Sequence, residues 1–336
     1  MVGKIYVNDS SVINRICNII TVNKSFLITT HYNIDGDGLG SEIAFYLLLK
    51  TLGKKVEMVN DDKVPCMYRF LPCIKEIKTV SDIHIRKPDV SIVLDCGVLE
   101  RTGKVAVLVQ KTPITINIDH HFSNTGFGTV NFISDSYSST GEMVYSILKQ
   151  RYKISKKQAI CLYTAILTDT GKFTYNIKPY TMSIAQQLIE IGISPEKIAE
   201  KVYMEKPLKS LNLLALVLGT LKYEKDTGVC WMTVNKEMYA TTGTKEQDTE
   251  GFIEILMNIK EAKAVFLLKE ENDSIKASLR SKGRYDVEKI ARKFGGGGHK
   301  QASGCRLKNV SLSIAAEKLL EEIRKHKTSV NPVKCL

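Results

Sequence analysis

The stretch HYNIDGDGLGSE, residues 31–42, decides the fold because it joins two apolar runs through a polar, glycine-rich junction. Residues 25–30 before it predict a buried strand, and SEIAFYLLLKTLG (41–53) predicts a helix that ends at Gly53. His31, Asp35 and Asp37 stand at this junction beside three glycines. Two carboxylates and an imidazole are typical ligands of divalent cations. The junction is therefore a candidate metal site.

Length and composition indicate a globular protein of two domains. The chain has 336 residues, with 43% hydrophobic and 25% charged residues. It has no apolar run of about 18 residues, as a membrane span would need, and its first residues do not resemble a signal peptide. We therefore expect a cytoplasmic protein with no membrane partner. Its eight cysteines include no C-x-x-C pair, which predicts reduced thiols instead of a zinc or redox motif.

The positive charge is concentrated near the C-terminus. Of a formal net charge of +12, a net +8 falls between residues 276 and 308, where ten Lys or Arg residues stand against Asp286 and Glu288. A patch of this kind attracts anions. This region is a candidate surface for phosphate-bearing ligands.

Alternating strand and helix patterns predict an α/β fold. DVSIVLDCG (89–97) and PITINIDHH (113–121) are apolar runs typical of buried parallel strands, and helical patterns follow them. We expect an N-terminal, mainly parallel sheet flanked by helices (1–193), a helical linker (194–215), and a smaller C-terminal α+β domain (216–336) across a cleft. The second domain should open with a hairpin turning at residues 226–228.

Further polar residues end the predicted elements of the first domain. Asp95 ends one strand; Asp119, His120 and His121 end the next; Asp169 ends a helix. Ligands of open parallel sheets bind beyond the carboxyl ends of the strands, so these groups are expected at one edge. A calcium-binding EF-hand is an alternative for the DGDG stretch alone, but no Glu stands at the twelfth position counted from Asp35.

So many carboxylates at one edge would repel one another unless cations neutralise them. Two divalent ions about 3.5–4 Å apart could hold a hydroxide and a phosphate between them, so that the bridging hydroxide attacks phosphorus in line. Mixed imidazole and carboxylate ligands favour Mn²⁺, with Mg²⁺ as the less favoured ion. The expected cofactor is two Mn²⁺ ions.

Four segments, HYNIDGDGLGS, VLDCG, NIDHH and LTDTGKF, resemble the first four motifs of the DHH phosphoesterase superfamily. The resemblance implies one metal held by His31, Asp35 and Asp95. It implies a second held by Asp37, Asp95, His120 and Asp169, with Asp95 bridging. It also implies that Asp119 orients an imidazole and that His121 faces the substrate phosphate as a catalytic residue. On this resemblance the glycines would let backbone and phosphate approach closely.

The second informative stretch is FGGGGHKQASG, residues 294–304. Consecutive glycines can form a nest of N–H groups around an anion, whereas the alternative is a flexible linker. The stretch resembles the DHH-associated nucleic-acid-binding domain of the nanoRNase and pAp-phosphatase branch. The resemblance implies that the substrate is bound by residues of both domains: Arg101, Arg280, Gly296, Gly297, Gly298 and His299. Thr174 stands where arginine is frequent and Ile34 where proline is usual, which leaves the exact substrate open.

The expected function is hydrolysis of short oligoribonucleotides to mononucleotides, of 3′-phosphoadenosine 5′-phosphate (pAp) to AMP, or of both. A cyclic-di-AMP or pApA phosphodiesterase is the alternative within the branch. Pyrophosphatases and exopolyphosphatases of the superfamily lack the glycine-rich stretch, and RecJ-type exonucleases are much longer. A non-catalytic nucleotide or RNA sensor would not need six intact ligands. The oligomeric state stays open, with a homodimer as one option.

Overall fold

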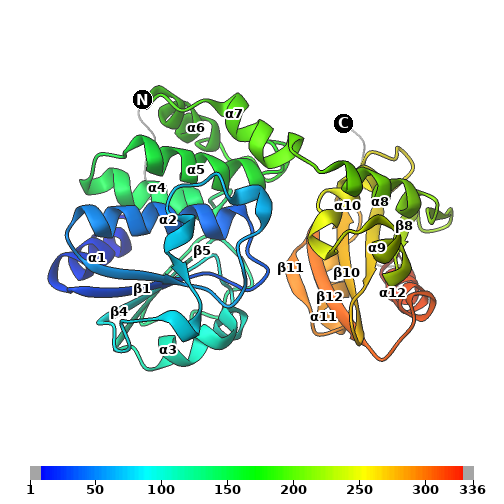
Figure 1. Cartoon of the computed structure of the whole chain (residues 1–336), viewed down its shortest axis with the longest axis horizontal. Coiled ribbons are helices and arrows are strands. Elements are labelled where there is room, and N and C mark those ends of the chain that lie inside the picture. Colours follow the sequence, from blue (N-terminus) through cyan, green and yellow to red (C-terminus); the bar gives the residue numbers. More distant parts are fainter. Residues whose placement is uncertain (1–8, 328–336) are drawn as a thin grey trace. The chain divides into compact units, whose positions relative to one another are not determined.

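The structure, a computed structural model, describes residues 9–327 (Figure 1). The chain forms two compact units, unit 1 (Met1–Glu205) and unit 2 (Lys206–Leu336). Within residues 9–327, no helix is long and apolar enough to cross a membrane. The seven cysteines of this range are free thiols, and Cys335 lies outside it.

Unit 1 contains a six-stranded parallel sheet, so the predicted α/β class is confirmed. In spatial order its strands are β3 (Ile77–Lys78), β2 (Lys55–Val59), β1 (Ser25–Thr29), β4 (Val90–Leu94), β5 (Ile114–Asp119) and β6 (Val130–Ile133). The central strands β1 and β4 are buried along almost their whole length, as their apolar runs predicted.

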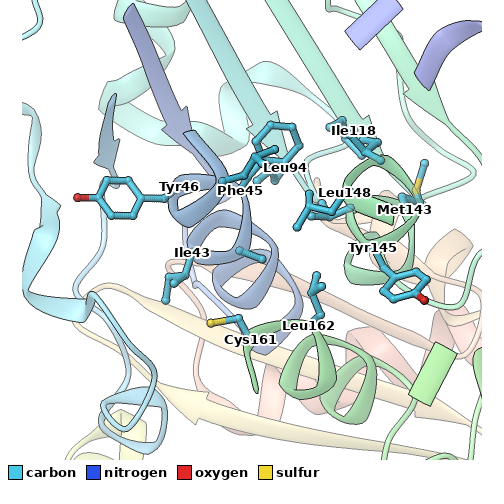
Figure 2. Packing of buried hydrophobic residues seen from close by; sticks show 14 of the residues in the cluster. Ile43, Phe45, Tyr46, Leu94, Ile118, Met143, Tyr145, Leu148, Cys161 and Leu162 are labelled. Carbon is cyan, nitrogen blue, oxygen red and sulfur yellow. The ribbon is translucent and has the colours of Figure 1, made fainter. Parts of the chain in front are cut away.

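Helices cover this sheet and supply most of the core. They are α1 (Asp9–Val22), α2 (Gly36–Thr51), α3 (Ala106–Gln110), α4 (Thr140–Arg151), α5 (Lys156–Asp169), α6 (Thr181–Glu190) and α7 (Pro195–Ala199), with 3-10 turns at 66–68, 74–76, 80–82 and 99–105 and a π-helical turn at 200–204. Figure 2 shows Phe45 of α2, Met143 of α4 and Leu162 of α5 in the same cluster as Leu94 and Ile118 of the sheet. This packing joins the three helices that carry or flank the polar residues of the junction.

Helix α2 begins five residues earlier than the sequence predicts. Asp35 is its N-cap, and Gly36 is its first residue. The glycines allow close helix packing: a Cβ at Gly36 would lie 2.4 Å from Thr168 Oγ1, and one at Gly40 would lie 2.4 Å from the Cys161 carbonyl oxygen. The sequence predicted that these glycines make room for a phosphate. At Gly36 and Gly40 the structure gives a different reason, because a side chain there would collide with α5.

Unit 2 contains a six-stranded mixed sheet. Its spatial order is β11 (Gly297–His299), β12 (Ala302–Lys308), β10 (Ser274–Ser281), β9 (Ala264–Glu270), β8 (Val229–Val234) and β7 (Lys222–Glu224), with only β8 and β9 parallel. The predicted hairpin is present between β7 and β8. The helices are α8 (Leu208–Leu218), α9 (Lys236–Thr242), α10 (Phe252–Met257), α11 (Val287–Lys293) and α12 (Leu312–Lys327), with a 3-10 turn at 246–249.

Unit 2 has two apolar clusters. One contains residues of α11 and α12 together with alternate residues of β10, and the other contains residues of α8 and α10 together with residues of β8 and β9. Unit 1 has clusters of its own. Each unit therefore buries an independent core.

Candidate metal centre

The polar side chains predicted at the strand ends meet at one edge of the parallel sheet. β1, β4 and β5 are neighbours, so their carboxyl ends lie next to one another. His31 lies just beyond β1, Asp95 directly follows β4, and His120 directly follows β5. The first turn of α2 supplies Asp37, and the last residue of α5 is Asp169. Five elements thus deliver charged or titratable groups to one place.

His31, Asp35 and Asp95 form the first group. Nε2 of His31 lies 3.5 Å from Asp35 Oδ2 and 3.4 Å from Asp95 Oδ2. The other ring nitrogen of His31 lies 2.7 Å from the Tyr32 carbonyl oxygen, which fixes the orientation of the ring. The two carboxylate oxygens of Asp35 have different partners. Oδ1 accepts hydrogen bonds from the backbone N–H groups of Asp37 and Gly38, so Asp35 caps the N-terminus of α2. The cap thereby directs Oδ2 of Asp35 towards His31.

Asp37, His120 and Asp169 form the second group. Nε2 of His120 lies 3.7 Å from Asp37 Oδ2, 3.5 Å from Asp169 Oδ2 and 3.6 Å from Asp95 Oδ1. Asp37 and His120 are buried, while Asp169 keeps a partly exposed carboxylate. Three carboxylates therefore surround one imidazole nitrogen.

Asp95 lies between the two groups. Its Oδ2 faces His31, whereas its Oδ1 faces His120 and accepts a hydrogen bond from Thr140 Oγ1 at 3.1 Å. The backbone of Asp95 has a φ of +55°, in the left-handed region that few residues other than Gly, Asn and Asp adopt. Such strain is typical of functional sites. The left-handed backbone conformation of Asp95 turns the chain sharply after β4, and the Asp95 carboxylate then lies between the two groups of candidate ligands.

The first turn of α4 holds Asp37, a contact that sequence reasoning missed. The backbone N–H groups of Thr140 and Gly141 donate to Asp37 Oδ2 and Oδ1 at 2.7 and 2.8 Å. Helix N-termini stabilise anions in this way. The spacing of Ser139 and Glu142 is a capping signal that locates the helix start. It does not say which carboxylate the helix would bind.

Asp119 and Asn124 fix His121. Nδ1 of His121 lies 2.6 Å from Asp119 Oδ1, so the imidazole that Asp119 contacts is that of His121. Asn124, which sequence reasoning missed, donates through Nδ2 to the second oxygen of Asp119 and to the Cys96 carbonyl oxygen. The loop after β5 is thereby fixed to the loop after β4.

The site concentrates titratable groups whose pKa values depart from their ordinary ranges. Burial, together with the charges of Asp95 and Asp35, raises the pKa of Asp169 to about 6. Burial and the neighbouring carboxylates also raise the pKa of Asp37. Although burial alone would lower it, the carboxylates of Asp35 and Asp95 raise the pKa of His31 to about 10. Bound cations would relieve this repulsion among carboxylates.

The donor set fits divalent cations. Within residues 9–327, groups whose ligand atoms lie within 4.8 Å of one another are His31–Asp35–Asp95, Asp37–His120–Asp169 and Asp95–His120–His121. Ion–ligand bonds of about 2.1 Å place neighbouring ligands about 3 Å apart, slightly closer than the spacings seen here. The first two groups contain the residues that the resemblance implied. The third also includes His121, which the resemblance assigned to the substrate.

Arg101 lies near the first group. Its guanidinium carbon is 5.9 Å from the centre of the Tyr32 ring, and its carbonyl oxygen accepts the Tyr32 N–H at 2.7 Å. Its charge also lowers the pKa of His31, against the larger effect of the carboxylates. The structure thus brings Arg101 to the edge where His31 lies.

The substrate residues predicted in unit 2 lie on neighbouring strands. Arg280 of β10 is opposite Ala302 of β12, and Ala302 is opposite His299 of β11. Nη2 of Arg280 lies 3.4 Å from Glu254 Oε1. The structure describes the backbone of His299 and not its side chain.

The expected glycine loop is in part a strand. Gly297–His299 form β11, so the prediction of a nest of turning N–H groups is wrong for these residues, as is a flexible linker. A Cβ at Gly296 would lie 2.1 Å from the Gly304 carbonyl oxygen, and one at Gly298 would lie 2.5 Å from that of Ala302. Glycine is required here because β12 approaches so closely.

Comparisons with known proteins find similarity in both units of the chain. The family described as "DHH family, N-terminal domain" matches residues 25–166, and "DHHA1 domain" matches residues 230–327. A protein of Thermus thermophilus named "Bifunctional oligoribonuclease and PAP phosphatase NrnA" is 31% identical over 304 residues, covering 90% of each chain.

Two solved structures show the same fold. The exopolyphosphatase-related protein from Bacteroides fragilis has a TM-score of 0.89 at 29% identity, covering 95% of this chain and 97% of its own. RecJ of Thermus thermophilus, solved with Mn²⁺, has a TM-score of 0.55 at 10% identity, covering 98% of this chain and 56% of its own.

Proposed function

The chain belongs to the DHH family of hydrolytic phosphoesterases, in the nanoRNase and pAp-phosphatase branch, and we propose that it hydrolyses short oligoribonucleotides, pAp or both with manganese as its cofactor. The observation that carries this proposal is the position of Asp95. Its two oxygens face two separate groups of ligands, as a carboxylate shared by two cations would. The relative named as an oligoribonuclease and PAP phosphatase supports the choice of substrate.

In this proposal His31, Asp35 and Asp95 hold one Mn²⁺ ion, and Asp37, Asp95, His120 and Asp169 hold the other. Bound there, the ions would supply a nucleophilic hydroxide at neutral pH and charge to stabilise the phosphoryl transition state. The mixed imidazole and carboxylate ligands support Mn²⁺ over Mg²⁺.

The chain's own residues would organise the reaction. Asp119 holds the ring of His121, so that His121 can bind a phosphate oxygen in a fixed orientation. The N-terminus of α4 keeps Asp37 in place through two backbone hydrogen bonds. The Thr140 hydroxyl keeps Asp95 in place by donating a hydrogen bond to its carboxylate.

Unit 2 would bind the nucleotide and carry no chemistry. Arg280, Gly296, Gly297, Gly298 and His299 lie on or beside adjacent strands of one sheet, in the region of highest positive charge. Arg101 of unit 1 would add a further cation for phosphate. A cyclic-di-AMP or pApA phosphodiesterase is the second candidate, because it would use the same groups.

The first test is a panel of substrates with purified protein. Mn²⁺-dependent hydrolysis of pAp and of an RNA trinucleotide is expected, with slower turnover of cyclic-di-AMP and of inorganic pyrophosphate. Hydrolysis should stop in EDTA and return with Mn²⁺. Turnover of pyrophosphate alone would contradict the proposal.

The second test separates binding from chemistry. Arg280→Ala should lower kcat/KM for pAp about 10- to 100-fold, the loss of one charge-assisted contact. Hydrolysis of bis-p-nitrophenyl phosphate, which has no nucleotide to hold, should change little. Arg324→Ala removes a cation of α12 that is paired with Glu224 and Glu317, so it serves as the control. An equal loss on both substrates would place Arg280 at the reacting centre instead.

A further inference from the structure

Three exposed aromatic side chains lie on the segments that carry the candidate ligands. Tyr32 follows His31 and is 36% exposed, Phe122 follows His121 and is 85% exposed, and Tyr175 lies beyond α5 and is 42% exposed. Phe122 has the largest exposed fraction of any large hydrophobic side chain in residues 9–327. Single exposed apolar residues are common, but three on the ligand-bearing segments are a pattern.

The turn that presents Phe122 is held firmly. The Asn124 N–H donates to the His121 carbonyl oxygen at 3.1 Å and closes a turn with Phe122 near its tip. The Asn124 side chain then binds Asp119 and the Cys96 carbonyl oxygen. The Thr125 N–H donates to the Gly97 carbonyl oxygen at 2.9 Å. Phe122 is thus an apolar ring held in solvent on a fixed support, one residue from His121.

An aromatic ring in this position suits a flat, apolar ligand. Nucleobases stack on exposed Phe and Tyr rings whatever their sequence, since every base has a π-face. A nucleotide substrate would bring a base close to the phosphate that is hydrolysed, whereas pyrophosphate and polyphosphate carry none. An exposed aromatic side chain on the segment that carries His121 would distinguish these substrate classes if it stacked on the base.

We infer that Phe122 is a specificity-determining residue that stacks on the nucleobase next to the reacting phosphate. This inference rests on the proposed function and deepens it. Phe122 acts on binding and positioning, so it gives the site a preference for nucleotides over phosphates without a base. It takes no part in ion binding.

The test compares pAp with its base-free analogue, ribose 3,5-bisphosphate. Phe122→Ala should lower kcat/KM for pAp about 5- to 150-fold, mainly through KM, and should leave the analogue unchanged. Phe122→Trp should keep or improve the activity on pAp. Val22→Ala, which trims an apolar side chain that is 75% exposed at the end of α1, is the control and should change neither substrate. Mn²⁺ affinity, measured by calorimetry, should be the same in all four proteins.

Three results would overturn the inference in different ways. If the wild-type protein prefers pAp to the analogue and Phe122→Ala keeps that preference, the stacking role is wrong and the proposed function stands. If the wild-type protein shows no preference for pAp, the nucleotide substrate class fails and the stacking role fails with it. A loss of Mn²⁺ affinity in Phe122→Ala would make the residue structural.

Discussion

At the scale of single residues, Asp95 combines an unusual backbone with a central position. Asp95→Asn keeps a residue type that tolerates a φ of +55°, so the fold should survive. Turnover of every substrate should fall to background, because one side-chain oxygen of the candidate bridge is lost. Hydrolysis assays, Mn²⁺ titration and thermal unfolding would check this.

Asp82→Asn, on an exposed turn, is the control for Asp95→Asn and should behave like the wild-type protein. Full activity of Asp95→Asn with saturating Mn²⁺ would refute a bridging role for this carboxylate.

Glu42 gives a prediction about stability and pH. It is fully buried on α2, its Oε2 accepts a hydrogen bond from Asn60 Nδ2 at 2.7 Å, and burial raises its pKa from 4.5 to about 8. Between these values the folded protein keeps a proton that the unfolded chain releases. The free energy of unfolding should therefore fall by up to about 1.4 kcal/mol for each pH unit over this range.

Glu42→Gln removes this titration while keeping an oxygen for Asn60. The difference in unfolding free energy between variant and wild-type protein should therefore increase in favour of the variant from pH 6 to pH 8. Urea unfolding in EDTA at both pH values would measure it. A difference that does not change with pH would mean that Glu42 is charged in the folded protein.

At the scale of elements, the sequence predicted the strands and helices whose residue pattern is contained within the element itself. The strands β1, β4 and β5 were found because buried parallel strands are continuous apolar runs. The start of α2 was missed because Gly36 and Gly38 are poor helix formers, yet the Asp35 cap and the packing against α5 make that turn helical. The helix propensity of a short segment contains no information about a contact between α2 and α5, which are far apart in the chain.

Contacts between distant parts of the chain also limited what could be predicted about the candidate metal centre. The strand-end positions of His31, Asp95 and His120 could be predicted from the sequence, because these polar residues follow apolar runs closely. The bond from α4 to Asp37 joins residues 103 and 104 positions apart, and no local pattern encodes it. The pairing of Gly297–His299 with β12 is a local hairpin, and it was missed for a different reason: consecutive glycines have a low strand propensity.

The contact between α2 and α5 gives a second test of stability. Gly40→Ala would bring a methyl group within 2.4 Å of the Cys161 carbonyl oxygen, so the backbone must shift and a loss of about 1–3 kcal/mol is expected. The three atoms nearest to a Cβ at Gly36 all belong to the Thr168 side chain, with Oγ1 at 2.4 Å, Cγ2 at 2.7 Å and Cβ at 2.9 Å. Thr168→Ala removes the first two and keeps the third, so it should restore part of the stability lost in Gly36→Ala and none of that lost in Gly40→Ala.

Thermal and urea unfolding of these single and double variants would check the pattern. Equal rescue of both glycine variants by Thr168→Ala would show that the packing is looser than the geometry implies. Loss of Mn²⁺ affinity is expected alongside the loss of stability, since Asp35 and Asp169 lie at the ends of these two helices.

At the scale of the whole molecule, each unit has its own sheet and its own apolar clusters. A fragment of residues 1–205 should therefore fold cooperatively, bind Mn²⁺ and hydrolyse bis-p-nitrophenyl phosphate. It should lose most activity on pAp and on the RNA trinucleotide, because Arg280 and residues 296–299, which are proposed to bind the nucleotide together with Arg101 and Phe122 of unit 1, lie in unit 2.

Calorimetry, Mn²⁺ titration and the two assays would test the fragment, with the full chain as the control. A fragment that folds and binds Mn²⁺ but retains full activity on pAp would remove unit 2 from substrate binding. The sequence predicted two domains from chain length and from the change in pattern after residue 215. The exact division within residues 194–215 remains a prediction.

The two amides that α4 directs at Asp37 have a consequence for spectroscopy. Amide protons that donate to a carboxylate resonate downfield of their random-coil positions, and Gly141 adds the characteristic nitrogen shift of glycine. In a ¹⁵N-correlated NMR spectrum, the Thr140 and Gly141 peaks would therefore stand apart from the crowded region. Diamagnetic Mg²⁺ would move these peaks and paramagnetic Mn²⁺ would broaden them away. Occupancy at Asp37 could then be followed without substrate, turnover or any mutation.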